Sequence, residues 1–514
     1  MPASAVKGTG TLEKDLHPEV RTGQGVVKGR VEDGIAVFRG IPYAQPPFGA
    51  LRFAAPEPVR PWDGVRPALE FGPPPPQYDR MSPQAADGSR EQAPDCLTVN
   101  VWSPALGAIG LPVMVWFHGG AYVFGRSAEP VYDGAGLARR DVVVVSFNYR
   151  VGMEGFGLLA GSPANRGLLD QIAALRWVQE NIAAFGGEPD DVTVFGESAG
   201  AGSIAALLAM PAAAGLFHQA VAQSVPGSYF TPRLAADIAG AVAARVGAVA
   251  TAEALRDGDP HLLVRAADAV FATMPERAGQ WGTVAHTETL CSPVVDGESL
   301  PCTPWEAVAG GAARELALML GHNRQEYRLF MAKRGEFGSV TEERASAALR
   351  VFGPGGDGER AYRAAYPEAD AEQLYETVMS DWLCRVPTLQ LLEAQVAAGG
   401  VAYAYELRWP APVSAGRLGS CHGLDVPLVF GTLDAPLARQ MLGETAPPEA
   451  AALSERMQSA WARFAASGDP GWPGYRFAGR LSKVFDCEDG LLGDPLAASR
   501  KAWEQHPFST LGAR

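Results

Sequence analysis

A serine between two glycines is the residue whose type and spacing most directly suggest chemistry. Residues 196–200 (GESAG) fit the pattern G-x-S-x-G and follow the apolar run VTVF at 192–195. In a sharp turn between a strand and a helix, such a serine presents its hydroxyl as a nucleophile, and the glycines prevent collisions with neighbouring backbone. The dipole of the following helix favours developing negative charge. Ser198 is therefore the candidate nucleophile, although the pentapeptide alone also fits a plain small-residue turn.

A second glycine-rich segment, HGGA at residues 118–121, directly follows the apolar run VMVWF. The carbonyl oxygen of an ester becomes an oxyanion during attack, and one preorganised N–H donor there contributes about 3 kcal/mol. We expect the amides of Gly120, Ala121 and Ala199 to be these donors. His118 precedes the glycines, so a structural role is expected for it. A simple glycine turn after a strand is the alternative for the whole segment.

A serine nucleophile needs a base and a carboxylate that orients the base, in the chain order Ser, acid, His when the serine stands on such a turn. Three histidines beyond Ser198 lie on plausible strand-end loops, namely His286, His322 and His422. His422 comes after the predicted strand 401–407, and Glu326 lies just past the predicted strand 316–320, where open α/β sheets keep their active sites. Singly, a surface histidine and half of an ion pair are the simpler interpretations. Together with the serine turn, Glu326 and His422 complete a candidate triad.

These residues need a sheet whose strand ends meet, and the apolar pattern predicts one. The continuous apolar runs at 113–117 and 142–145 are typical of parallel strands that are covered on both faces. Residues 168–185 carry apolar side chains at three- and four-residue steps, which predicts a helix with one buried stripe. This alternation of strands and helices predicts an α/β fold with a central, mostly parallel sheet.

The remaining segments predict what surrounds that sheet. The apolar runs 26–31 and 35–38 are separated by Asp-Gly, which predicts an antiparallel hairpin at the N-terminal edge. Residues 230–380 are rich in Ala, Glu and Arg and are expected to form helices over the sheet. No repeat or break divides the pattern. We therefore expect one large domain over residues 19–514 and a loose leader at residues 1–18.

Composition and charge exclude several classes of partner. The net charge of −14 repels nucleic-acid phosphates and anionic lipid. The N-terminus lacks the apolar run of a secretion signal, and the apolar stretch 204–217 is too short to span a bilayer. We expect a cytoplasmic protein with no nucleic-acid or membrane partner, whose chemistry needs no metal or organic cofactor. The six cysteines contain no C-x-x-C pair, and spacing leaves open whether Cys291 and Cys302 form a disulfide.

Further motifs occur in a fixed order between residues 20 and 475, namely FRGIPY at 38–43, LRF at 51–53, DCL at 95–97, NYRVG at 148–152, LDQ at 169–171 and FGG at 185–187. With the serine turn, they resemble the type-B carboxylesterases, the family that also contains cholinesterases and bacterial p-nitrobenzyl-type esterases. The resemblance implies an α/β-hydrolase fold with helical cap elements. It also implies a serine carboxylic ester hydrolase that acts through an acyl-enzyme intermediate on a small or medium-sized organic ester, with Ser198, Glu326 and His422 as its triad.

The chain departs from the family pattern at three places. Relatives often have a glutamate where Pro94 stands, and that glutamate pairs with the arginine equivalent to Arg150, so Arg150 must find another carboxylate. Secreted relatives bridge the cysteine equivalent to Cys96 to one further upstream, which this chain lacks. Cys96 is therefore expected to be a buried free thiol in a reducing compartment. Ala121 replaces a third glycine, which leaves open whether esters of bulky tertiary alcohols are accepted.

Functions besides ester hydrolysis fit parts of the sequence. Residues 200–205 (GAGSIA) match the dinucleotide-binding pattern G-x-G-x-x-A, but the acidic residue expected about twenty positions later is absent. A non-catalytic binding protein on the same fold is compatible with the motifs, as is acyl transfer or cyclisation by the same triad. Glu197 beside the nucleophile supplies either a negative field or a buried, hydrogen-bonded carboxylate. The sequence indicates neither the natural substrate nor the oligomeric state.

Overall fold

The computed structural model describes residues 16–77 and 95–512. Within these residues the main sheet has eleven strands, which are in spatial order β14 (Gly490–Gly493), β13 (Leu481–Phe485), β12 (Val401–Leu407), β11 (Ala317–Asn323), β10 (Gln219–Gln223), β9 (Gly187–Glu197), β7 (Leu111–Phe117), β8 (Val143–Phe147), β6 (Thr98–Ser103), β4 (Ile35–Pro42) and β3 (Arg30–Glu32). The strands from β13 to β8 run parallel to one another, whereas β14 at one edge and β6, β4 and β3 at the other pair antiparallel. The predicted α/β fold with an antiparallel N-terminal edge is thereby confirmed.

Apolar side chains on both faces of the sheet explain why its strands read as continuous apolar runs. In β7, Val113, Val115 and Phe117 join one hydrophobic cluster, and the alternate residues Met114 and Trp116 join a second cluster on the opposite face. Successive side chains of a strand point to opposite faces, so a strand covered twice has no polar side. The expected double layer of helices is therefore a direct consequence of this sequence pattern.

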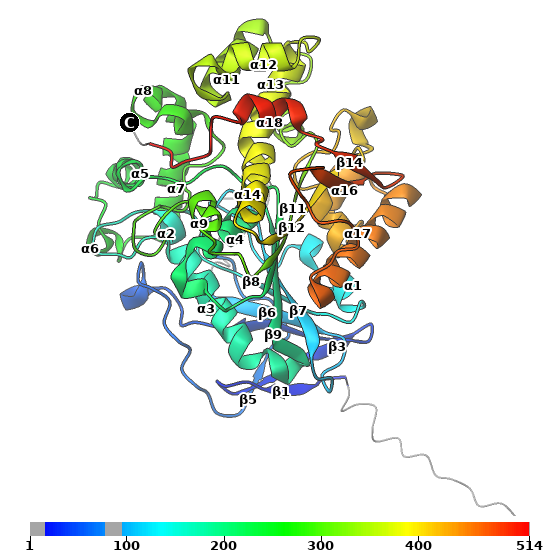
Figure 1. The fold of residues 1–514 in the computed structure, drawn as a ribbon. Helices are drawn as coiled ribbons and strands as arrows, with labels where there is room; N and C mark the ends of the chain where they lie inside the picture. Colours follow the sequence, from blue (N-terminus) through cyan, green and yellow to red (C-terminus); the bar gives the residue numbers. More distant parts are fainter. Residues whose placement is uncertain (1–15, 78–94, 513–514) are drawn as a thin grey trace, which may run out of the picture.

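Two groups of helices contribute to these two clusters, some over a face of the sheet and others beyond the ends of its strands (Figure 1). Those that contribute to the cluster of Val113 are α2 (Gly152–Phe156), α3 (Arg166–Asn181), α4 (Ala199–Ala209), α5 (Pro232–Arg245), α6 (Ala252–Leu255), α7 (Pro260–Ala272), α8 (Ala278–Trp281), α9 (Pro304–Ala309), α10 (Arg328–Arg334), α11 (Glu342–Phe352), α12 (Gly358–Ala365), α13 (Ala371–Ser380), α14 (Val386–Ala397) and α18 (Ala497–Trp503). Those that contribute to the cluster of Met114 are α1 (Ala135–Ala138), α15 (Asp425–Phe430), α16 (Pro436–Leu442) and α17 (Pro448–Ser467). Among the described helices, none is both long and apolar enough to cross a membrane.

The N-terminal hairpin differs from its prediction in one respect. The run 26–31 is divided at Gly29, because β2 (Val26–Lys28) leaves the main sheet and pairs with β1 (Glu19–Arg21) and β5 (Val65–Pro67) in a separate three-stranded sheet. A Cβ atom on Gly29 would overlap the ring of Phe38, so this crossing depends on a tertiary approach that spacing does not reveal. Residues 1–15 of the predicted leader, and Pro94, lie outside the described residues.

Candidate active site

Ser198 stands on the turn between β9 and α4, in a conformation that few residues adopt. Its φ of 56° and ψ of −124° lie outside the ordinary regions for a residue with a side chain, which costs about 1–3 kcal/mol. A Cβ atom on Gly200 would overlap the carbonyl oxygen of Phe117, and one on Gly196 would lie 2.8 Å from that oxygen. Both glycines are therefore required by the close approach of β7, which is the reason expected from the sequence.

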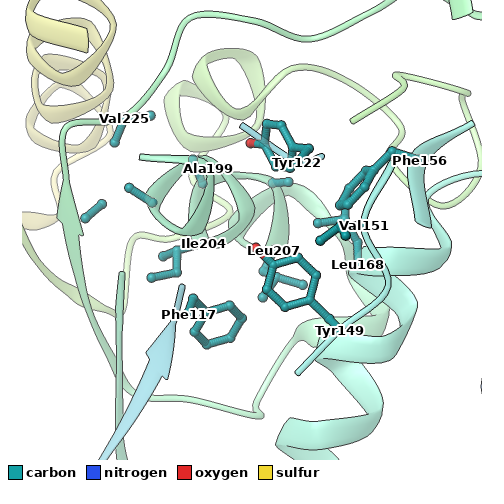
Figure 2. Close-up of a cluster of buried hydrophobic side chains, with 14 of the residues drawn as sticks. Phe117, Tyr122, Tyr149, Val151, Phe156, Leu168, Ala199, Ile204, Leu207 and Val225 are labelled. Carbon is teal, nitrogen blue, oxygen red and sulfur yellow. The ribbon is translucent and has the colours of Figure 1, made fainter. Parts of the chain in front are cut away.

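Buried side chains beneath the turn hold it in place. Figure 2 shows Ala199, Ile204 and Leu207 of α4 beside Phe117 and Tyr149, and all five side chains are at most 2% exposed. Protein interiors are packed as densely as organic crystals, so a backbone fixed in this way has little freedom to shift. The turn and the first amide of α4 therefore have a defined position relative to the end of β7.

The structure brings Ser198, His422 and Glu326 together from three separate strand ends. Ser198 Oγ lies 2.9 Å from Nε2 of His422, and Nδ1 of the same ring lies 2.6 Å from Oε2 of Glu326. Glu326 is completely buried and His422 is 8% exposed. The order nucleophile, imidazole, carboxylate is that of a serine hydrolase triad.

Three donors hold the carboxylate of Glu326. Besides the imidazole of His422, the Ser224 hydroxyl donates to Oε1 at 2.6 Å, and the Asn323 amide donates to the same oxygen at 2.7 Å. Burial by itself would raise the pKa of Glu326, but these hydrogen bonds lower the pKa below its usual value. The carboxylate therefore stays ionised and can fix the orientation of the imidazole.

Two further groups face His422. Nε2 of His422 lies 3.2 Å from Oε1 of Glu197, and burial raises the pKa of Glu197 to about 8. Burial disfavours the charged imidazolium, but Glu197, the Cys384 thiol and Glu326 together raise the pKa of His422 well above its usual value. The Phe330 ring lies 5.5 Å from the imidazole, measured between ring centroids, and supplies an apolar wall. The imidazole thus lies between the carboxyl groups of Glu326 and Glu197, and Oε1 of Glu197 has no hydrogen-bond partner within the described residues.

The glycine-rich loop after β7 has the backbone conformation of a donor site. Gly120, Ala121 and Tyr122 have consecutive positive φ values of 118°, 51° and 62°. Among the described residues, no hydrogen-bond acceptor is found for the amides of Gly120 and Ala121, and the Ala199 amide belongs to the first turn of α4, where helical N–H groups lack partners. Gly119 lies so close to the nucleophile that a Cβ atom on it would be 3.3 Å from Cβ of Ser198. Within the described part of the chain, the amides of Gly120, Ala121 and Ala199 are thus available as donors.

The other histidines considered as bases lie elsewhere. Among the described histidines, only His422 is within hydrogen-bond distance of Ser198. His118 is buried under the loop, where Nδ1 lies 2.8 Å from the Gly119 oxygen, its ring stacks on Tyr149, and burial lowers its pKa to about 4. His322 is directed to its own strand end, with Nδ1 3.2 Å from the Asn323 oxygen, and His286 is exposed.

Two polar partners of the site were not predicted from the sequence. Asp170 binds Arg150 through Nε at 2.8 Å and through a terminal nitrogen at 2.7 Å, and both side chains are at most 1% exposed. Asp170, which belongs to the LDQ motif, is thus the carboxylate that Arg150 was expected to find. Ser224, the donor to Glu326, directly follows β10. Its place at the carboxyl end of a parallel strand was an available signal.

The remaining candidate sites do not fit a cofactor. Glu326, Cys384 and His422 have possible ligand atoms within 4.8 Å of one another, but Glu326 and His422 already bind each other, and burial raises the pKa of Cys384 to about 12. The dinucleotide-like glycines face protein, because a Cβ atom on Gly202 would overlap the Tyr122 hydroxyl. None of the six cysteines forms a disulfide, so Cys291 and Cys302 are not bridged, and Cys96 is buried as predicted.

Comparisons with known proteins agree with this geometry. The family described as the carboxylesterase family matches residues 16–480. Para-nitrobenzyl esterase of Bacillus subtilis is 38% identical over 496 residues, which are 94% of this chain and 98% of that protein. Fumonisin B1 esterase of Sphingopyxis macrogoltabida is 35% identical over 488 residues, which are 90% of this chain and 85% of that protein.

Solved structures show the same likeness. A PNB esterase structure superposes with a TM-score of 0.84 at 37% identity and covers 95% of this chain and 99% of its own. A carboxylesterase of Geobacillus stearothermophilus gives a TM-score of 0.83 at 35% identity, with 94% and 99% covered. The fold is thus the α/β-hydrolase fold that the resemblance implied. The chain belongs to the carboxylesterase family, and its activity is that of a serine carboxylic ester hydrolase.

Proposed function

We propose that Ser198, His422 and Glu326 are the catalytic triad of this esterase and that the amides of Gly120, Ala121 and Ala199 form its oxyanion hole. The observation that carries the proposal is the unbroken path from Ser198 Oγ through the imidazole to a buried carboxylate, with separations of 2.9 and 2.6 Å. The positive φ values of the glycine-rich loop support the second part, as does the lack of an acceptor for the Gly120 and Ala121 amides among the described residues.

Acylation follows from this arrangement. Nε2 of His422 removes the proton of Ser198 as Oγ attacks the carbonyl carbon of the ester, and the three amides stabilise the resulting oxyanion. Glu326 holds the imidazole in the tautomer with its proton on Nδ1 and stabilises the imidazolium. When the tetrahedral intermediate collapses, the imidazolium gives its proton to the leaving alkoxide. The products of this half-reaction are an alcohol and an acyl group esterified to Ser198.

Deacylation uses the same groups in reverse. His422 removes a proton from a water molecule, whose oxygen attacks the acyl carbon, and the same amides hold the second oxyanion. The imidazolium then protonates Oγ of Ser198, which releases the carboxylic acid and restores the free enzyme. An alcohol in place of water would give acyl transfer, and a hydroxyl of the acyl chain would give cyclisation. Analysis of the products separates these outcomes from hydrolysis.

We propose small aryl or benzyl esters of short acids as substrates. The name of the Bacillus subtilis relative indicates a para-nitrobenzyl ester, and the other relative named above is an esterase of fumonisin B1. The aromatic wall that Phe330 presents beside His422 supports an aromatic or other apolar group next to the scissile bond. Para-nitrophenyl acetate and butyrate and para-nitrobenzyl acetate are therefore suitable first substrates.

Covalent labelling tests the triad. A fluorophosphonate should react stoichiometrically, peptide mapping should locate the adduct on Ser198, and the labelled enzyme should lose esterase activity. Ser198→Ala should not be labelled and should lose about 10⁵–10⁶-fold in kcat, the scale seen when a serine nucleophile is removed. Appreciable turnover by folded Ser198→Ala would refute the nucleophile. A folded wild-type protein that neither reacts nor turns over would favour a binding role.

We also propose that residues 19–514 form a single domain that works in the cytoplasm without a nucleic-acid or membrane partner. The hydrophobic cluster that contains Val113 extends from the sheet into the helices above it, which supports one domain. The lack of a disulfide among the six cysteines supports the location, and the net charge of −14 supports the absence of anionic partners. Two separate calorimetric unfolding transitions would argue against one domain, and recovery of the native protein with membranes or nucleic acid would argue against the second part.

A further inference from the structure

The carbonyl groups of the glycine-rich loop all have hydrogen-bond partners that hold them in fixed directions. These pairs are His118 with the Tyr149 hydroxyl at 2.7 Å, Gly119 with Nδ1 of His118 at 2.8 Å, Gly120 with the amides of Val123 and Phe124 at 3.0 and 3.1 Å, Ala121 with the Thr289 hydroxyl at 2.6 Å, and Tyr122 with the Gly152 amide at 2.6 Å. Because each carbonyl is engaged, the amides of the loop are the groups left to face the serine. The backbone of the glycine-rich loop is thus oriented by hydrogen bonds to its carbonyl groups.

Ala121 is the residue of this loop for which an external hold matters most. Its φ of 51° is left-handed, which costs about 1–2 kcal/mol for a residue with a Cβ atom. The peptide that carries the Ala121 amide is held through the Gly120 oxygen by the local turn. The next peptide, which carries the Ala121 oxygen, is held by Thr289. Relaxation of the strained dihedral angles would therefore be resisted on one side by the turn and on the other by this side chain.

Thr289 is well placed to provide that resistance. It lies 168 positions along the chain from Ala121, and its side chain is nearly buried, with the residue 7% exposed. Its hydroxyl lies 2.6 Å from the Ala121 oxygen and 2.7 Å from the Cys291 oxygen, so these two carbonyls share its single hydrogen, and its oxygen accepts from the Cys291 amide at 3.2 Å. Its own carbonyl accepts from the Thr287 hydroxyl at 3.1 Å. A threonine has few rotamers, so these contacts hold the hydroxyl beside the loop. The segment 287–291 thus presents a fixed hydroxyl to the loop.

We propose that Thr289 is a positioning residue of the oxyanion hole, which keeps the amide of Ala121 aimed at the developing oxyanion by holding the carbonyl of the same residue. The inference rests on the proposed role of that amide. The oxyanion exists only in the transition state and the tetrahedral intermediates, so loss of this hold lowers kcat and leaves KM nearly unchanged. A role of Thr289 in substrate binding alone would change KM instead.

Three variants test the proposal. Thr289→Val keeps the shape and removes the hydroxyl, Thr289→Ser keeps the hydroxyl, and Thr432→Val is a control that removes a threonine hydroxyl bonded to the Val131 carbonyl at 2.8 Å. Thr289→Val should lose about 10-fold or more in kcat, short of the 10²–10³-fold loss that follows removal of an oxyanion donor. Thr289→Ser and Thr432→Val should stay within about 3-fold of the wild type. Thermal unfolding of each variant reports any general loss of stability.

The affinity for a transition-state analogue distinguishes the proposed role of Thr289 from a merely structural one, which would leave that affinity unchanged. An aryl trifluoromethyl ketone adds to the serine and forms an oxyanion in the hole, so its affinity should fall in Thr289→Val by the same factor as kcat/KM. If Thr289→Val does not fold, Thr289→Ala serves as the variant without the hydroxyl.

The inference is overturned if the folded variant keeps kcat within twofold of the wild type, if its loss appears in KM, or if Thr289→Ser is equally impaired. A wild-type enzyme without labelling or turnover would instead overturn the proposed function.

Discussion

The two halves of the site are built in different ways. On the side of β7 and β9, the chemistry is carried by the backbone and by a serine whose position the backbone dictates, and close approaches at Gly196 and Gly200 fix it. On the side of β11 and β12, the chemistry is carried by Glu326 and His422, whose side chains are positioned by other side chains and by strand-end loops. The first half depends on the absence of Cβ atoms, and the second on the presence of particular donors.

The difference predicts how each half fails when it is altered. In the first half, any added atom must displace backbone, so substitutions there should cost stability along with activity. In the second half, a donor can be removed without a steric clash, so the folded enzyme should persist while its rate or its pH dependence changes. Variants in both halves can therefore separate damage to the fold from damage to the chemistry.

Glu326→Gln should have the largest effect among the variants of the second half that keep the fold. The amide nearly preserves the shape of the carboxylate but can neither stabilise the imidazolium nor hold the required tautomer, so we expect a loss of about 10⁴-fold in kcat. Rates with para-nitrophenyl butyrate, together with circular dichroism, check this expectation. A folded variant with nearly wild-type kcat would place the acid of the triad on another residue.

Gly200→Ala should show how strongly an added atom on the side of β7 and β9 lowers the stability of the fold. The added Cβ atom would overlap the carbonyl oxygen of Phe117, so we expect a loss of about 3 kcal/mol or more in the free energy of unfolding. Gly240→Ala in α5 is a matched control, because no atom lies within 4 Å of its added Cβ and helical alanine is favoured over glycine by about 1 kcal/mol. Denaturant unfolding should therefore move the two variants in opposite directions. Equal stability of the two variants would contradict a rigid turn.

The same contrast explains how much of the molecule the sequence could predict. The strands of the parallel core, the serine turn and the glycine-rich loop depend on local patterns, and residues 113–121 and 192–200 display them directly. Glu326 and His422 could be selected because they follow strands, and the structure places His422 beside Ser198 and Glu326 beside His422.

The place of Ser224 at a strand end was visible in the sequence, but the particular partners of Ser224 and Thr289 could not be predicted, since they lie 102 and 168 positions away in the chain. Spacing in one sequence says nothing of contacts between distant side chains. The crossing at Gly29 was missed for the same reason.

Ser224→Ala should have a smaller effect than Glu326→Gln. It removes one of the donors to the buried carboxylate, and a hydrogen bond to a charged group contributes about 1.5–3 kcal/mol, so kcat should fall by roughly 10-fold to 100-fold. Ser103→Ala is a matched control, because that serine is equally buried and donates at 2.7 Å to the Phe185 carbonyl away from the triad. If both variants lose similar stability but only Ser224→Ala loses kcat, the result would support the view that Ser224 positions the side chain of Glu326. Equal kcat in both variants would contradict it.

Glu197→Gln should have the smallest effect on the maximal rate and should act on the pH dependence. In its ionised form Glu197 raises the pKa of His422, and catalysis requires the neutral imidazole, so activity is present above the pKa of His422 and lost as the pH falls through it. Removal of that charge lowers the pKa of His422, and the acid limb of kcat/KM should therefore move to lower pH. Glu336→Gln removes another buried carboxylate, one that pairs with Arg344, and should leave the acid limb in place. An acid limb that stays in place or moves to higher pH in Glu197→Gln would show that the field at the imidazole is set by Glu326 alone.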